Sequence, residues 1–315
     1  MIRVLLPVLS VMVLVGCDPA SPSFYYDYPI SYLQNISTSG TPVACDFFGT
    51  AGDGLAGSGT HLYFIDSDVG YVLADIDLGQ PINDVTTTAE GGFGVAVCST
   101  LLYYVSNDTY VVHNAVVLPV DGIFVVTKPQ SNTLYVIGSD GTVVEVETIN
   151  WTVSATHTTG LTSPAAAAVS SDGQALFVAD GADNTVKKLS TSSFEIQAEC
   201  PVEGGVADLY AGSGSSIWAA PAQKSELWTI NLGSGLHDGT YQLPSYPVSV
   251  AVMSSGLYVF AGCPGYGTVV IDTQTGDTEM TVSDYGTPDD IAILGSGDRS
   301  LLCVAERFEV YVLQK

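Results

Sequence analysis

Hydrophobic and polar positions alternate along most of the chain in short runs that are separated by turn residues. The clearest run begins at Pro164 and passes through a Ser-Asp-Gly turn at 171–173 into the apolar segment 175–180. Two more alternating segments follow at 185–189 and 194–197. Val, Ile, Leu and aromatic residues favour a pleated, half-buried strand, and Asp-Gly steps supply the positive φ angles of tight hairpins. The pattern therefore predicts four strands and three turns in about 42 residues, and almost no helix.

The same pattern recurs in seven copies along the chain. They begin near Tyr28, Pro81, Val120, Pro164, Gly205, Pro247 and Pro288. A repeat of this length with four strands is typical of a propeller blade, because each blade has two faces that only neighbouring blades can bury. The sequence therefore predicts an all-β fold, a seven-bladed β-propeller of four-stranded antiparallel blades, in one domain at residues 28–315.

The seventh copy is shorter than the others. Segments 301–305 and 309–313 supply its second and third strands, and the sequence then ends at Lys315. An N-terminal strand commonly completes the final blade of a propeller, which removes an exposed edge. Only residues 18–27 lie upstream of the first copy, where Ser23–Tyr26 could pair briefly. We therefore expect an incomplete last blade. If residues 23–26 do not pair with it, the ring closes by face-to-face packing of this blade against the first blade.

A sequence motif marks the clearest copies. It consists of a Pro, an alternating Val-Ala-Val-Ser segment, an Asp-Gly type of turn, a second strand and a Val-Ile-Asp segment. The motif appears at 247–260 with 269–273, at 164–180, and at 63–66 with 76–81, and it is looser in the second and fifth copies. This pattern resembles YVTN-type β-propellers, which are similar to NHL repeats. The resemblance implies the architecture but no activity, because propellers serve as adhesins, scaffolds and redox enzymes.

The first residues have the order of an export signal. Arg3 precedes an apolar run, Val4–Val15, which is shorter than the ~20 residues of a membrane-spanning helix. Leu14–Cys17 resembles the bacterial lipobox, which implies that Cys17 is acylated and begins the mature chain. We therefore expect a lipoprotein signal peptide at 1–16 and a lipidated tether at 17–27. The lipid would hold the propeller outside the cytoplasm, on the inner or the outer membrane of a bacterial cell envelope.

Charge and cysteine content narrow the set of functions. The chain has 33 acidic and 8 basic residues and a formal net charge of −25, so it should repel the phosphates of nucleic acid. Beyond Cys17 the cysteines number five and show no Cys-x-x-Cys spacing, which argues against a zinc knuckle or a dithiol redox motif. At most two disulfides are possible. Most of these cysteines lie in apolar strand segments, where a free thiol behaves as a small hydrophobe.

One set of acidic residues recurs at equivalent places in the repeat. Asp84, Asp208 and Asp290 each stand directly before the first apolar residue of the expected inner strand, and Asp121 stands one residue earlier in its copy. Equivalent places in a ring converge at one mouth of the central channel. Such carboxylates could bind Ca²⁺ or another cation. Alternatively, each could accept hydrogen bonds from backbone N–H groups in the turn that enters the strand.

Other candidates for catalysis are not evident. The four histidines at 61, 113, 157 and 237 are scattered, and the sequence has no nucleophile elbow and no phosphate-binding loop. We therefore expect a non-catalytic binding or scaffold lipoprotein, without a cofactor, that recognises an envelope protein or a surface polysaccharide through the faces of the propeller. The alternative is an enzyme of the propeller lyase, lactonase or quinoprotein type, with a metal or cofactor at the channel mouth.

Overall fold

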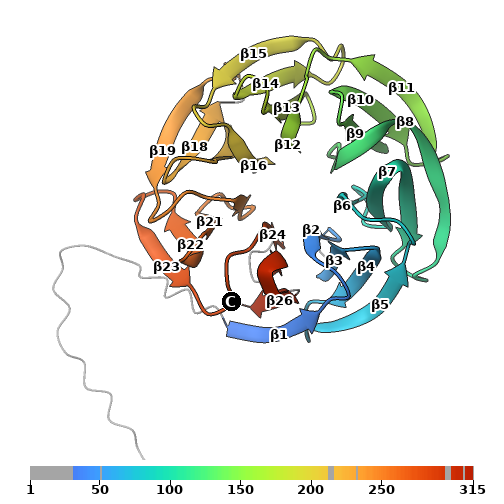
Figure 1. Cartoon of the computed structure of the whole chain (residues 1–315), viewed down its shortest axis with the longest axis horizontal. Helices are drawn as coiled ribbons and strands as arrows, with labels where there is room; N and C mark the ends of the chain where they lie inside the picture. Colours follow the sequence, from blue (N-terminus) through green and yellow to red (C-terminus); the bar gives the residue numbers. More distant parts are fainter. Residues whose placement is uncertain are drawn as a thin grey trace, which may run out of the picture.

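The strands form a ring of sheets around a common centre, as Figure 1 shows. The computed structural model describes residues 31–49, 52–211, 216–231, 233–294, 299–307 and 309–314. Within these ranges all regular elements are β-strands except the short 3₁₀ helix Ala305–Arg307, and none is a helix of the length and apolarity that crossing a bilayer requires. The predicted all-β propeller fold is confirmed. The predicted signal peptide at 1–16, the predicted acylation of Cys17 and the predicted tether at 17–27 fall outside the described residues.

The first strand named in each sheet is its innermost strand. The first sheet contains β2 (Pro42–Phe47), β3 (Asp53–Ser58), β4 (His61–Asp66) and β5 (Tyr71–Asp77). The wide sheet contains β6 (Asp84–Thr87), β7 (Phe93–Ser106), β8 (Val112–Thr127), β9 (Thr133–Gly138), β10 (Thr142–Glu147) and β11 (Thr152–Thr158). The third sheet contains β12 (Pro164–Val169), β13 (Ala175–Asp180), β14 (Thr185–Ser190) and β15 (Ile196–Pro201).

Three further sheets complete the ring. The fourth sheet contains β16 (Val206–Ala211), β17 (Ser216–Pro221), β18 (Glu226–Asn231) and β19 (His237–Gln242). The fifth sheet contains β20 (Ser249–Val252), β21 (Tyr258–Cys263), β22 (Gly267–Asp272) and β23 (Thr278–Val282). The closing sheet contains β24 (Asp290–Ile293), β25 (Arg299–Val304), β26 (Glu309–Gln314) and β1 (Ser31–Ser37).

The prediction of seven separate four-stranded blades is wrong. The described strands form six blades when each hydrogen-bonded sheet is counted as one, and the wide sheet has six strands. β7 pairs with β6 through residues 94–97 and with β8 through residues 99–105, while β8 pairs with β9 through residues 122–127. Ser99, with a φ of 52°, and Gly122 pair with each other where the two strands change partner. The second and third copies of the repeat therefore share one continuous sheet.

The prediction of an incomplete last blade is also wrong. β1 pairs with β26 along its whole length, from Ser31 to Ser37, and so supplies the outer strand of the closing sheet. Asn35 Nδ2 donates to Glu309 Oε1 at 2.6 Å across this pair. The pairing removes the open edge that β26 would otherwise present. Sequence reasoning missed it because residues 31–37 were assigned to the first copy, and Ser23–Tyr26 lies outside the described residues.

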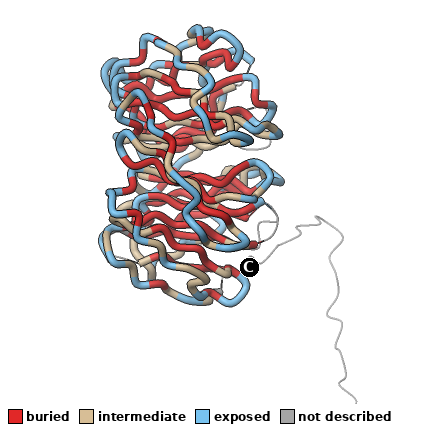
Figure 2. Tube along the Cα trace, turned by 90° about the vertical axis from the view of Figure 1, so that its right-hand side faces the viewer, coloured by how far each residue is buried: buried red, intermediate tan, exposed pale blue. Residues whose placement is uncertain are grey.

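The core lies between neighbouring sheets. All six residues of β13 are buried, whereas residues of the outer strand β11 alternate between exposed and half-buried. In the side view the buried positions run through the interior strands and the exposed ones gather at turns and outer strands (Figure 2). One cluster joins Phe177 of the third sheet to Ile217 and Ile230 of the fourth. Each sheet is therefore stabilised by apolar burial against both of its neighbours.

Three aromatic residues have left-handed backbone angles. Each stands at the end of a turn that joins the third strand of a copy to its outer strand. Tyr110, Trp151 and Phe194 have φ values of 54°, 52° and 56°, a region that costs non-glycine residues roughly 1 kcal/mol or more. Their rings pack against neighbouring copies of the repeat. Trp151 stacks on Tyr104 with ring centroids 3.8 Å apart, and Phe194 stacks on His157 at 4.0 Å. At the equivalent turns of other copies this position is glycine: Gly70, Gly235 and Gly276.

Candidate functional site

A cavity of about 290 Å³ lies at the centre of the ring. Its walls come from the inner strands β2, β6, β12, β16, β20 and β24 and from the end of β8. Five carboxylates belong to the lining: Asp46, Asp84, Asp208, Asp289 and Asp290. No Lys, Arg or His is among the lining residues of the described part of the chain. The cavity is therefore lined by acidic side chains.

Three of the predicted aspartates make the same two hydrogen bonds. One oxygen of each accepts the N–H of the next residue: Val85 for Asp84 at 2.8 Å, Leu209 for Asp208 at 2.7 Å and Ile291 for Asp290 at 2.9 Å. The other oxygen reaches the inner strand of the next copy and accepts from Val125 at 2.8 Å, Val250 at 2.8 Å and Cys45 at 2.7 Å, respectively. Each carboxylate thus ties two neighbouring inner strands together.

Asp46 plays a similar part, and the sequence reasoning missed it. It lies in β2, and one of its oxygens accepts the N–H of Phe47 at 2.8 Å. The other accepts the N–H of Thr87 at 2.8 Å and the hydroxyls of Thr86 and Thr87 at 3.2 and 3.1 Å. Asp46 stands two residues after Ala44, the residue equivalent to Asp84. The period of two in a strand, which puts alternate residues on one face, was the signal that could have revealed it.

Asp121 does not join the other aspartates. Its side chain is exposed and is absent from the cavity lining. The third copy contributes Phe124, Val125 and Val126 to the wall, because β8 changes partner at Gly122 and reaches the cavity only after that point. The structure therefore brings together Asp84, Asp208 and Asp290 with Asp46, and leaves Asp121 outside.

Burial raises the pKa values of aspartates that line the cavity. It raises the pKa of Asp208 to about 8 and that of Asp290 to about 6. It also raises the pKa of Asp84 well above its usual range and that of Asp46, although hydrogen bonds from backbone N–H groups oppose the shift. The negative charge of Asp290 contributes at both Asp84 and Asp208. These carboxyl groups hold a proton at pH values where surface carboxyl groups have lost theirs.

The aspartates are spread around the wall rather than gathered at one point. Among the residues that the structure describes, no three side chains of His, Cys, Asp or Glu are placed so that they could share a metal ion. What the arrangement does provide is a set of acceptors that join inner strands. A Ca²⁺ ion at the channel mouth stays a hypothesis of the sequence.

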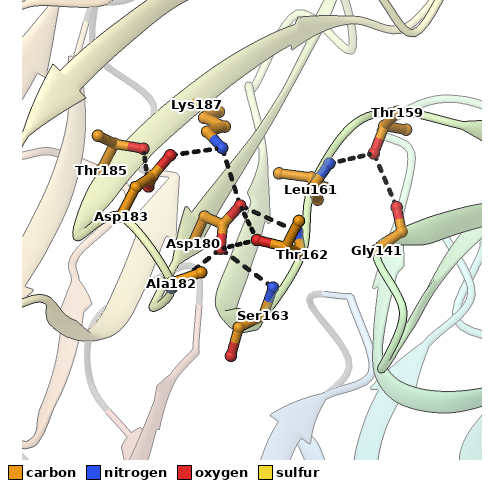
Figure 3. Close-up of polar contacts among 10 residues, drawn as sticks. All are labelled: Gly141, Thr159, Leu161, Thr162, Ser163, Asp180, Ala182, Asp183, Thr185 and Lys187. Carbon is orange, nitrogen blue, oxygen red and sulfur yellow. Dashed lines mark hydrogen bonds and ion pairs between the residues drawn. The ribbon is translucent and has the colours of Figure 1, made fainter.

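A second polar cluster, which the sequence reasoning did not single out, lies in the third sheet (Figure 3). Asp180, at the end of β13, accepts from the N–H groups of Thr162, Ser163 and Ala182 at 3.0 to 3.1 Å. Lys187 Nζ of β14 lies 2.8 Å from carboxylate oxygens of both Asp180 and Asp183. Burial alone would raise the pKa of Asp180, but Lys187 and the N–H groups outweigh it and lower the pKa to about 2. The Asp180 carboxylate therefore holds the loop before β12 against the β13–β14 hairpin, and Lys187 neutralises its charge.

The four histidines are far from forming one site. Each stacks or tilts against an aromatic ring: His61 on Tyr63, His113 on Tyr104, His157 on Phe194 and His237 on Trp228. Two of them also contact a carboxylate on a neighbouring strand, His61 with Asp75 at 2.6 Å and His157 with Glu145 at 2.7 Å. None belongs to the cavity lining. They therefore add no base or ligand to the central cavity.

Comparisons with known proteins establish the fold. No family model and no curated protein matches the chain. Among solved structures, Kuenenia stuttgartiensis hydrazine synthase matches with a TM-score of 0.77 and 14% identity, over 89% of this chain and 97% of that one. The Myceliophteria thermophila Cps50 (Swd1) β-propeller domain matches with a TM-score of 0.76 and 13% identity, over 91% and 100%. The chain has a β-propeller fold. At this identity the likeness says nothing about activity.

Proposed function

We propose that the protein is an envelope-anchored, non-catalytic binding lipoprotein of the YVTN/NHL propeller type, which recognises an envelope protein through one face of the ring. Acylation of Cys17 would supply the anchor, and the propeller would supply the binding surface. The observation that carries the binding role is a set of exposed apolar side chains at equivalent turns of the repeat, and the geometry of the cavity supports it.

The exposed apolar residues lie in or beside turns between a third strand and an outer strand. They are Val69, Val111, Ile149 and Leu236, which are 56%, 53%, 70% and 53% exposed. The inner strand runs in the same direction in every copy, so the turns between third and outer strands all lie on one face of the propeller. Exposed apolar side chains that recur on one face favour a protein partner over a polysaccharide, because aliphatic groups gain most from packing against other apolar side chains.

The cavity fits a structural role better than a catalytic one. Asp84, Asp208 and Asp290 each use both oxygens to accept backbone N–H groups. A general base or a metal ligand needs an oxygen directed at a substrate or an ion, whereas these oxygens are engaged between strands. The enzyme alternative therefore gains no support from the cavity, and recognition falls to the faces of the ring.

The test is affinity capture of the full-length, lipidated protein from its native envelope. The variant with Val69→Ser, Ile149→Ser and Leu236→Ser removes three of the apolar side chains from the binding face. We expect this variant to capture at most about one tenth as much partner as the wild type, since loss of ~1.4 kcal/mol of binding energy corresponds to a factor of ten. Tyr246 and Tyr266, which are each 45% exposed, lie in connections on the opposite face.

The matched control is therefore the variant with Tyr246→Ser and Tyr266→Ser, which should capture as much partner as the wild type. Equal capture by both variants would refute recognition through this face. The anchor is tested in parallel with Cys17→Ser, which should move the protein out of the detergent phase. If Cys17→Ser and the wild type fractionate alike, the lipoprotein assignment is wrong.

A further inference from the structure

Two buried thiols meet where the ring closes. Cys45 lies in β2 of the first sheet and Cys303 lies in β25 of the closing sheet, and the two residues belong to the same core cluster. Cys45 Sγ is also 3.7 Å from the carbonyl oxygen of Leu301 on β25. The N–H of Cys45 donates to Asp290, which is the cross-strand partner of Cys303. These contacts hold Cys45 against the strand that carries Cys303.

The other buried cysteines have no such neighbour. Cys98, Cys200 and Cys263 lie in three different core clusters, each without a second cysteine, whereas Cys45 and Cys303 share one cluster. All five are free thiols in this structure. The proximity of Cys45 and Cys303 is therefore specific to the junction between the first and the last sheet of the ring.

We propose that Cys45 and Cys303 form a disulfide bond that closes the propeller covalently. The oxidant is a disulfide of another molecule, either a small one or a thiol–disulfide oxidoreductase. One cysteine thiolate attacks this disulfide, forms a mixed disulfide and releases the first thiol of the oxidant. The second cysteine then attacks the mixed disulfide and releases the other thiol. The two cysteines lose two protons and two electrons, and the oxidant's disulfide is reduced to two thiols.

The surroundings of the pair determine when the bond forms. Both thiols are buried in the closed ring. Burial raises the pKa of Cys45 well above its usual range. At Cys303 the proximity of Cys45 lowers the pKa, but burial and nearby carboxylates outweigh this effect, so that its pKa is also raised. Only the thiolate attacks a disulfide. The cross-link therefore forms while the closing sheet is joining the first sheet, and once the ring has closed the bond is protected from reductants.

The cross-link would join residues near the two ends of the propeller. A disulfide stabilises a fold mainly by restricting the unfolded chain, and its effect grows with the length of chain that it encloses. Here it encloses nearly the whole propeller. The proposal goes beyond the binding function and does not depend on it, although export from the cytoplasm would place the chain where such oxidants occur.

The experiment refolds the full-length chain from denaturant in either oxidised glutathione or dithiothreitol. Free thiols are then alkylated in denaturant, and the digested protein is analysed by mass spectrometry. We expect a linked peptide pair containing Cys45 and Cys303 after oxidative refolding, with Cys98, Cys200 and Cys263 alkylated. The melting temperature should be roughly 5–15 °C higher than that of the reduced protein, and native oxidised protein should resist reduction until denaturant is added.

Cys303→Ser should abolish the difference in melting temperature between the two refolding conditions, and Cys98→Ser, the matched control, should preserve it. If Cys303→Ser does not fold, the peptide map of the wild type still decides the question. Alkylation of Cys45 and Cys303 to the same extent as Cys98 after oxidative refolding would overturn the proposal. So would pairing of either residue with Cys98, Cys200 or Cys263.

Discussion

Asp180 and Asp208 are both enclosed by the propeller, and both accept hydrogen bonds from backbone N–H groups. Their pKa values are nevertheless shifted in opposite directions. Asp180 has a pKa of about 2 and Asp208 a pKa of about 8. The ammonium group of Lys187 lies 2.8 Å from Asp180. Asp208 faces a cavity whose described lining contains other carboxylates and no cation.

The comparison shows that N–H donors alone do not offset the burial of a carboxylate in this fold. Burial raises the pKa at both positions, and a neighbouring cation reverses the shift at only one of them. A second carboxylate, Asp290, increases the shift at Asp208. The ion pair therefore stays charged, whereas Asp208 and Asp290 exchange protons near neutral pH. Three predictions test this contrast.

The largest effect is expected at the ion pair. Lys187→Met keeps an apolar side chain in the core but leaves Asp180 buried without its cation, which costs about 3–5 kcal/mol of unfolding free energy. Chemical denaturation measures this loss. Lys188→Met is the matched control, because Lys188 is only half-buried and its ammonium contacts one backbone oxygen, that of Gly233, so its loss should be below about 1 kcal/mol. Adding Asp180→Asn to Lys187→Met should recover part of the stability. Equal losses at Lys187 and Lys188 would contradict this view of the pair.

A smaller effect is expected on the pH dependence of stability. The unfolded chain releases the proton of Asp208 near pH 3.8, whereas the folded chain keeps it up to about pH 8. Between these values the folded state binds more protons, so stability declines as the pH rises. For Asp180 the sign is opposite: its contribution is complete above pH 3.8 and is lost as the pH falls through about 2.

Asp208→Asn should flatten the curve of unfolding free energy between about pH 4 and pH 8. The decline should shrink by about 2 kcal/mol, because a pKa difference of one corresponds to ~1.4 kcal/mol and solvent in the cavity partly screens this incompletely buried group. Asp121→Asn, which removes an exposed carboxylate outside the cavity, is the matched control. An unchanged slope in Asp208→Asn would show that Asp208 is ionised in the folded protein at neutral pH.

The smallest effect separates a strand-joining aspartate from a surface one. Asp84→Ala leaves the N–H groups of Val85 and Val125 without their acceptor and should cost about 1–2 kcal/mol. Asp121→Ala should cost less than about 0.5 kcal/mol. Thermal unfolding with and without EDTA also tests the Ca²⁺ hypothesis. If EDTA lowers the melting temperature and Asp84→Ala removes that sensitivity, the carboxylates bind metal rather than serve only as acceptors.

Local patterns were enough to predict the propeller, because alternation and turn residues depend on near neighbours in the chain. The same regularity put Asp84, Asp208 and Asp290 at equivalent places, and the structure shows all three on the cavity wall. Asp121 was misplaced because the path of β8 past Gly122 depends on its partners in the wide sheet. The predicted number of blades was wrong for the same reason, because the local sequence pattern does not determine which strands form hydrogen bonds with each other.

The remaining contacts required information about distant segments. Asp180 meets Lys187 through the register of the β13–β14 hairpin, and it meets Thr162 through a loop that precedes β12. Cys45 and Cys303 come together only when the ring closes, and nothing in their spacing indicates a pair. The export signal and the acylation of Cys17 stay predictions of the sequence.

The pairing of β1 with β26 has a consequence for biosynthesis. A ribosome delivers β1 before β26, so the outer strand of the closing sheet has no partner until all the other described strands have been synthesised. Sheets such as β12–β15, which come from one continuous segment, can assemble during translation. The ring itself cannot be finished by vectorial folding from one end. A chain that is exported unfolded, with both ends released before folding begins, avoids this conflict.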